Sequence, residues 1–281
     1  MRTEEVIKIV SKGILMRKFT NNLHSFIEKI TGTSIYVKLG IYKTKKIKYA
    51  PKFSASYLAL IADYIDRIAT FKPSNIFEIG ANYGQDAEFL RKRFGLENSD
   101  VYIFEPHPEI IAEAERYFSF NCYPLAISDK NEKITFHAIK LESSNTGISS
   151  LKKHKFNKED DYFDVEVETI RMDDFFEINN IDEIDFLKID VEGAAYEVLN
   201  GFGNELKRVK AIQLESEYIP IWVGQKTWTH ISNMLLDNDF QLIHFELQED
   251  GIQSDSFWIQ KKFVNHQIYD ISTQKWHQEN I

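Results

Sequence analysis

The stretch Asn75-Ile76-Phe77-Glu78-Ile79-Gly80-Ala81-Asn82-Tyr83-Gly84 decides the fold of this chain. Its apolar start ends in a carboxylate and a glycine, and a second glycine follows four residues later, just before a helical stretch. Glycine lets the backbone turn sharply and approach a ligand closely, because no side chain occupies that space. A strand, a glycine loop and a helix in this order predict the first βα unit of an open parallel sheet, with a ligand at the loop.

Short apolar runs alternate with helical stretches from residue 75 onward, which is typical of βαβ units around a mostly parallel sheet. We predict strands over 75–80, 101–105, 123–127, 184–190, 211–215, 241–246 and 257–261. Helices fit at 54–71, 85–94, 109–118, 194–201 and 228–238. The region 128–176 interrupts this rhythm, and we interpret it as an added β excursion that covers the site. The predicted fold class is therefore α/β, with a doubly wound, mostly parallel seven-stranded sheet.

Residues 1–50 follow a different pattern, and we predict that they form an annex to a main domain over 51–281. Apolar residues between 6 and 30 recur at helical spacing, and five lysines and three tyrosines then occur within residues 36–49. The lysines either discourage pairing at a solvated strand edge or form a surface for an anionic substrate or partner. The annex is also our candidate surface for homo-oligomer formation.

The overall composition is that of an ordinary globular protein, with 43% hydrophobic and 27% charged residues. The net charge of −9 argues against a general nucleic-acid binder, which needs a basic surface. A single cysteine, Cys122, excludes an intrachain disulfide and a cysteine zinc site. Residues 1–13 are too charged for a signal peptide and no apolar run approaches the ~20 residues of a membrane span. We therefore expect a cytoplasmic protein.

The spacing of the glycine loop points to the kind of ligand. It reads Glu-x-Gly-x-x-x-Gly, whereas a dinucleotide pyrophosphate favours Gly-x-Gly-x-x-Gly beside a helix N-terminus. S-adenosylmethionine has no phosphate, and Glu78 suits its cationic methionine end while loop amides suit its carboxylate. Glu105 ends the next strand, 21 positions past Gly84, where an acidic residue suits the ribose hydroxyls. The sequence therefore predicts S-adenosylmethionine as the cofactor.

Seven motifs resemble, in order, those of the FkbM family of methyltransferases. They include Phe104-Glu105-Pro106-His107-Pro108 and Ile184-Asp185-Phe186-Leu187-Lys188-Ile189-Asp190-Val191-Glu192-Gly193, and the full set lies at 77–85, 104–108, 125–129, 148–151, 167–175, 184–193 and 213–215. The resemblance implies a class I methyltransferase that acts mostly on hydroxyls of sugars, glycans and natural products. The family usually has a second acidic residue after Glu-Gly-Ala, where this chain has Ala195-Tyr196-Glu197, so any role of that acid is in doubt.

The cofactor loop and the resemblance together give the cofactor-binding residues that we expect. These are Glu78, Gly80, Ala81, Asn82, Gly84, Gln85, Glu105, Pro106, Ser128 and Asp190.

Asp190 and Glu192 are the expected catalytic residues. Ligands of open α/β sheets lie at the carboxyl ends of the strands, and Asp190 ends such a strand. Methyl transfer to an oxygen needs the acceptor in line with the methyl group and a base for the hydroxyl proton. We predict Asp190 as this base or as an orienter of the acceptor, with Glu192 beside it. The alternative is that Asp190 only caps the following helix.

Four residues are expected at the acceptor. Glu215 and Glu217 close the next strand, and Tyr218 and Trp222 follow it. The aromatic rings either form a wall for a sugar ring or pack beneath a long loop. We expect no metal, although Asp190, Glu215 and Glu217 would offer oxygen ligands for magnesium or calcium. His107 is expected in the wall of the cofactor pocket, and His154 in a solvated lysine-rich loop.

The predicted function is O-methylation of a hydroxyl on a sugar, glycan precursor or related natural product. The acceptor is thus a small molecule or glycan rather than nucleic acid, and the domain over 51–281 is the catalytic one. Two alternatives stay open at this stage. One is an N-methyltransferase on a peptide or amide, and the other is a non-catalytic binding protein that keeps the fold.

Overall fold

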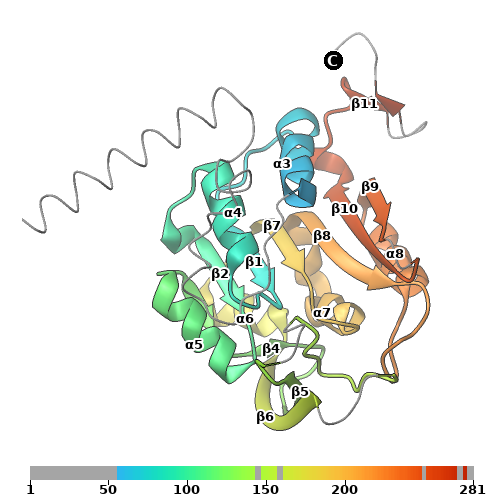
Figure 1. Ribbon diagram of the computed structural model, residues 1–281. Helices are drawn as coiled ribbons and strands as arrows, with labels where there is room; N and C mark the ends of the chain where they lie inside the picture. Colours follow the sequence, from blue (N-terminus) through green and yellow to red (C-terminus); the bar gives the residue numbers. More distant parts are fainter. Residues whose placement is uncertain (1–55, 143–146, 157–160, 249–250, 271–274, 277–281) are drawn as a thin grey trace, which may run out of the picture. The chain divides into compact units, whose positions relative to one another are not determined.

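A seven-stranded sheet forms the centre of the computed structural model, which describes residues 56–142, 147–156, 161–248, 251–270 and 275–276 (Figure 1). The strands lie in the order β3-β2-β1-β7-β8-β10-β9, and all neighbours are parallel except the two pairs that involve β10. The predicted doubly wound, mostly parallel sheet is therefore confirmed. The predicted annex over 1–50 lies outside the described residues.

The strands of the large sheet are β1 (Ile76–Ile79), β2 (Val101–Phe104), β3 (Asn121–Tyr123), β7 (Ile184–Ile189), β8 (Val209–Glu217), β9 (Phe240–Leu247) and β10 (Gln253–Gln260). The helices beside it are α3 (Ser56–Ile68), α4 (Gln85–Phe94), α5 (Pro108–Tyr117), α6 (Met172–Asn179), α7 (Ala195–Gly201) and α8 (Trp228–Asp237). Near the end of the chain, β11 (Tyr269–Asp270) pairs with β12 (Lys275–Trp276).

Helices cover both faces of the large sheet, with α3, α4 and α5 on one side and α6, α7 and α8 on the other (Figure 1). The central strands β1 and β7 are consequently buried along their whole length. Strands covered on both faces are apolar on both faces rather than alternating. The side chains of β1 and β7 are accordingly apolar except for Glu78, Asp185 and Lys188. The core around Phe77, Leu187 and Ile212 lies between the sheet and the second helix layer.

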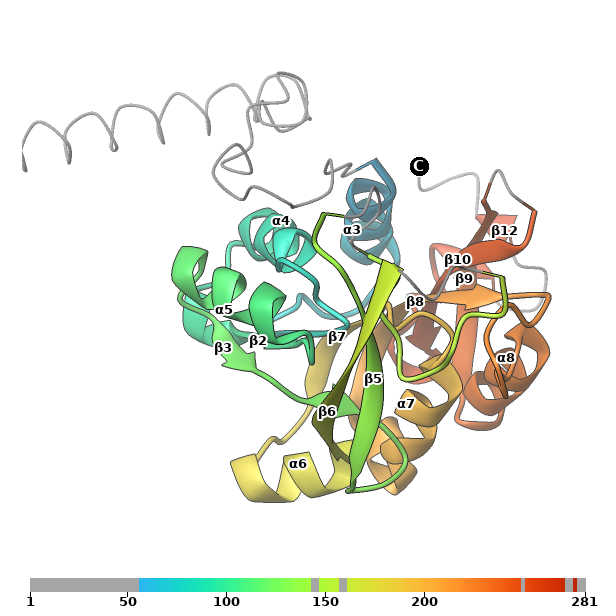
Figure 2. The same ribbon diagram turned by 60° about the horizontal axis from the view of Figure 1, so that its bottom comes forward.

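A smaller sheet of β4 (Ala126–Ile127), β6 (Tyr162–Ile170) and β5 (Lys133–Ile139) stands across the carboxyl ends of β1, β2 and β7 (Figures 1 and 2). It confirms that the region after 128 is a β excursion near the predicted site. Two details differ. The strand predicted over 123–127 is split between the two sheets, because Pro124 has no N–H with which to continue a ladder. The excursion also ends in helix α6, whose Met172, Phe175 and Phe176 are buried at helical spacing.

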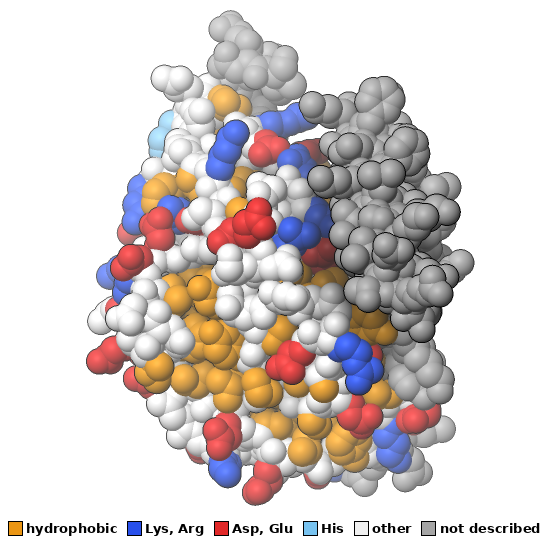
Figure 3. All heavy atoms as spheres, turned by 90° about the vertical axis from the view of Figure 1, so that its left-hand side faces the viewer, with side chains coloured by type: hydrophobic (Ala, Val, Ile, Leu, Met, Phe, Trp, Pro, Cys, Tyr) orange, Lys and Arg blue, Asp and Glu red, His pale blue; other side chains and the backbone are white. Residues whose placement is uncertain are grey.

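The side of the molecule that carries α4 and α5 shows acidic and basic side chains of mixed sign around apolar ones (Figure 3). The described side chains on this face thus form no continuous basic stripe. Within the described part of the chain, no helix has the length and apolar character needed to cross a membrane.

Candidate active site

A cleft of about 830 Å³, partly open to solvent, lies at the carboxyl ends of β1, β2 and β7. Phe136 of β5 and Leu151 close it from the side of the small sheet. Seven of the predicted site residues line it: Gly80, Asn82, Glu105, Pro106, Asp190, Glu192 and Glu215. The sequence therefore predicted the strand ends that meet at this cleft.

Glu105 is fixed in the cleft by two backbone amides. The N–H groups of Asn82 and His107 each donate to one of its carboxylate oxygens, both at 2.8 Å. Each oxygen keeps a further lone pair for a ligand hydroxyl. Burial raises the pKa of Glu105 to about 7, although the two amide donors oppose this shift. This rigid acceptor pair is what a ribose diol requires.

Gly80 allows a close contact between two strand ends. Its φ is +78°, and a Cβ there would lie 1.8 Å from the backbone oxygen of Asp190. The N–H of Asp190 donates to the oxygen of Ile79 at 2.9 Å. The absence of a side chain at Gly80 therefore lets β1 close onto the end of β7 and brings Asp190 to the cofactor loop.

Glu78 lies behind the loop and does not line the cleft. Its side chain is 1% exposed, accepts a hydrogen bond from the N–H of Ala87 at 2.9 Å, and lies 3.3 Å from Nζ of Lys188. We therefore revise the predicted contact between Glu78 and the methionine end of the cofactor. Glu78 instead anchors the start of α4 through the N–H of Ala87. It also lies directly beside Lys188, because β1 pairs with β7 in that register.

Lys188 is a site residue that sequence reasoning missed. Its Nζ also lies 3.1 Å from Asp86 and 3.0 Å from Asp190, so that one buried cation contacts three carboxylates. Burial lowers the pKa of Lys188, but the charges of the three carboxylates outweigh this effect and raise it well above its ordinary value. The signal in the sequence that could have identified it is a lysine within a mostly apolar predicted strand.

Asp190 does not cap the following helix. The N-cap of α7 is Ala194, which makes no side-chain capping bond, and the carboxylate of Asp190 pairs with Lys188. The Asp190 side chain is 38% exposed and lines the cleft. Of the two interpretations of this residue, the structure agrees with a cleft carboxylate.

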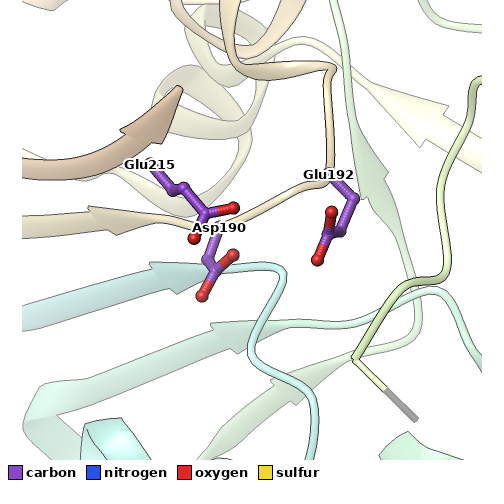
Figure 4. Close-up of side chains that lie close together, drawn as sticks. All are labelled: Asp190, Glu192 and Glu215. Atoms are coloured by element: carbon purple, nitrogen blue, oxygen red, sulfur yellow. The ribbon is translucent and has the colours of Figure 1, made fainter. Parts of the chain in front are cut away.

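Asp190, Glu192 and Glu215 offer carboxylate oxygens that all lie within 4.8 Å of one another. Asp190 and Glu215 approach each other from neighbouring strand ends, and Glu192 faces them from the loop after β7 (Figure 4). Burial raises the pKa of Glu192 and of Glu215 well above the ordinary value, and the neighbouring carboxylates raise both further. Glu217, predicted in this group, is buried and accepts a hydrogen bond from Gln225 instead.

Trp222 packs beneath the loop after β8, as one of the two interpretations of the aromatic residues holds. It is 1% exposed, and its ring lies 4.7 Å from that of His154. Gly193, with φ of +84°, makes room for it, since a Cβ there would lie 2.3 Å from the indole. Tyr218 is 41% exposed and contacts the rings of Trp228 and Phe245 at 5.9 and 6.0 Å. Neither Trp222 nor Tyr218 lines the cleft.

The other predicted cofactor residues support the cleft from outside its wall. Gly84 is the N-cap of α4, and Ala81 and Gln85 are buried. The N–H of Ser128 donates to Ile170 at 3.1 Å, which ties β4 to the end of β6. His107 is likewise buried, with Nε2 3.0 Å from the oxygen of Ile139.

Comparison with known proteins identifies the family and a similar curated protein. The model of the "Methyltransferase FkbM domain" matches residues 78–242. The 2-O-methyltransferase NoeI of Sinorhizobium fredii (strain NBRC 101917 / NGR234) is 28% identical over 173 residues, which cover 57% of this chain and 70% of that protein.

Two solved structures are also similar. Methyltransferase FkbM from Methylobacillus flagellatus KT has a TM-score of 0.46 and 13% identity, over 72% of this chain and 51% of that one. The O-methyltransferase from Bacillus cereus, in complex with SAH, has a TM-score of 0.46 and 14% identity, over 85% of this chain and 97% of that one.

Proposed function

Because the chain belongs to the FkbM methyltransferase family and is an S-adenosylmethionine-dependent methyltransferase, we propose that it methylates a hydroxyl oxygen of a sugar or glycan precursor. The observation that carries this proposal is the Asp190 carboxylate, which lines the cleft while Lys188 holds it. A hydroxyl must lose its proton as its oxygen attacks, so a fixed carboxylate base suits this acceptor. The name of the similar NoeI, a 2-O-methyltransferase, supports an oxygen acceptor.

The residues of the cleft fit the cofactor. The Glu105 carboxylate, which two backbone amides fix, would accept hydrogen bonds from the ribose hydroxyls. The apolar side chains of Phe104 and Ile127 in the cleft suit the adenine ring. The side-chain oxygen of Asn82 is buried without a hydrogen-bond partner, so an N–H group of the cofactor would satisfy it. We propose these residues as the cofactor contacts.

When bound, the cofactor supplies an electrophilic methyl group on a sulfonium. The acceptor oxygen would take this methyl group, and the electron pair of the carbon–sulfur bond would remain on sulfur. Asp190 accepts the hydroxyl proton, so the products are a methyl ether and S-adenosylhomocysteine. Glu192 and Glu215 surround the same point and orient the acceptor hydroxyl, because their oxygens lie within 4.8 Å of Asp190.

The test is to incubate the protein with S-adenosylmethionine labelled in its methyl group and with a panel of acceptors. The panel contains neutral monosaccharides, oligosaccharides, nucleotide sugars, amino sugars and short peptides. We expect the label as a methyl ether on a saccharide, located by mass spectrometry and NMR. Label on nitrogen, or on peptides alone, would establish the N-methyltransferase instead.

A further inference from the structure

Glu215 has a second carboxylate directly opposite it in the sheet. Asp255 of β10 pairs with Glu215 of β8 in the antiparallel ladder. Like charges in this position destabilise a sheet. In the described ranges, no lysine or arginine forms an ion pair with either carboxylate. Such a local conflict is typical of a functional site rather than of a structural one.

Three glutamines, rather than cations, hold this carboxylate pair. Nε2 of Gln248 bridges the two groups, at 2.7 Å from Glu215 and 3.1 Å from Asp255. Gln253 donates to the second oxygen of Glu215 at 2.7 Å, and Gln213 to the second oxygen of Asp255 at 3.0 Å. Each of the four carboxylate oxygens thus accepts one amide N–H and keeps a lone pair for another donor.

Gln213 adds an acceptor without a donor. Gln213 is 3% exposed, and its Nε2 donates to Asp255, yet its Oε1 has no hydrogen-bond partner. A buried carbonyl oxygen in this state is destabilising until a donor reaches it. The cluster of Glu215, Asp255 and the three glutamines therefore accepts further O–H donors at several points.

Glu215 joins this cluster to the cleft, which it lines together with Asp190 and Glu192. The three carboxylates lie side by side (Figure 4). We propose that the Glu215–Asp255 pair, with Gln213, Gln248 and Gln253, is a subsite for adjacent hydroxyl groups of a sugar ring. This inference rests on the proposed saccharide acceptor and deepens it. Hydroxyls donate to the carboxylate oxygens and to Gln213, and the bound ring places a neighbouring hydroxyl at Asp190. Because the cluster offers several fixed acceptor oxygens, it favours a polyol over an acceptor with a single hydroxyl.

The experiment compares Gln248→Leu and Gln253→Leu with Gln241→Leu. Gln241 is a buried glutamine near the start of β9, where it donates to Leu242 and contacts none of the cluster. The acceptor is the saccharide that the labelling panel identifies. We expect KM for this saccharide to rise about tenfold or more in the two cluster variants. Their kcat and their Kd for S-adenosylhomocysteine should stay near those of the starting protein, and Gln241→Leu should change none of the three.

Two results would overturn the proposal, and they are distinguishable. If the starting protein methylates a saccharide and both cluster variants keep its KM, the subsite is wrong and the proposed function stands. If the starting protein neither methylates nor binds any saccharide of the panel, as titration of its S-adenosylhomocysteine complex would show, both proposals fail. Retained S-adenosylhomocysteine binding in each variant shows that the fold is intact.

Discussion

Nζ of Lys188 lies 3.0 Å from the carboxylate of Asp190, at the end of the strand that carries both residues. The same ammonium group lies 3.3 Å from Glu78 and 3.1 Å from Asp86. Lys188 therefore connects Asp190 in the cleft to β1 and to α4, the two elements on either side of the cofactor loop. The pair Lys188 and Glu78 is almost completely buried, with side chains 5% and 1% exposed.

Lys188→Met should destabilise the protein and impair catalysis. Removing one partner of a buried ion pair leaves an uncompensated charge, which costs about 3–5 kcal/mol in the free energy of unfolding. Urea denaturation measures this loss, and methyl transfer to the acceptor measures the effect on catalysis. The double variant Glu78→Gln, Lys188→Met removes both charges and should recover part of the stability, while turnover should stay low because Asp190 has lost its partner.

Lys210→Met is the matched control for Lys188→Met. Lys210 lies on the neighbouring strand β8 and contacts Asp185 and Glu183 at 2.7 and 2.6 Å, away from the cleft residues. Its loss should lower stability without lowering turnover per folded molecule. Equal effects of the two substitutions on turnover would show that Lys188 has only a structural role.

Glu105→Gln should weaken cofactor binding in a fold that stays intact. The substitution keeps the shape of the side chain but removes the charge and one of the two acceptor oxygens. We expect the Kd for S-adenosylhomocysteine to rise about tenfold or more, measured by calorimetric titration. Glu109→Gln, an exposed change in the first turn of α5, is the control. An unchanged Kd in Glu105→Gln would remove the ribose contact from our proposal.

Asp190→Asn should reduce turnover about a hundredfold or more, because positioned general bases contribute about 10² to 10⁴ in rate. The asparagine amide keeps the size of the side chain but cannot take the hydroxyl proton. The Kd for S-adenosylhomocysteine should change little, since Glu105 holds the ribose from another strand end. If methyl transfer survives at the original rate, another group such as Glu192 or Glu215 is the base.

The sequence predicted those parts of the site that depend on a single strand end. Glu105 and Asp190 follow apolar runs, and parallel strands bring their carboxyl ends to one edge. The contact of Glu78 with Lys188 depends on the register between β1 and β7, which the sequence does not contain. Asp255 was missed for a similar reason, because only the antiparallel pairing of β10 brings it beside Glu215.

Buried acids should make the protein less stable as pH rises from about 5 to 8. Burial raises the pKa of Glu217 to about 7, whereas the ordinary value is 4.5. The folded state therefore holds this proton more tightly than the unfolded state, and its contribution is complete below pH 4.5 and lost as pH rises through 7. Because Glu217 is only 2% exposed, the loss amounts to up to about 3 kcal/mol. Glu105 adds to it in the same direction, with its pKa near 7.

Glu217→Gln removes this titrating group while keeping an acceptor for the amide of Gln225. The unfolding free energy of this variant, measured in urea at intervals between pH 5 and 8, should fall less steeply than that of the starting protein. Glu205→Gln serves as the control and should leave the slope unchanged, because Glu205 is a half-buried residue in the short turn before β8 and pairs with Arg208. If Glu217→Gln keeps the full slope, Glu217 is ionised throughout this range, and the loss of stability with pH comes from Glu105 and the other buried acids.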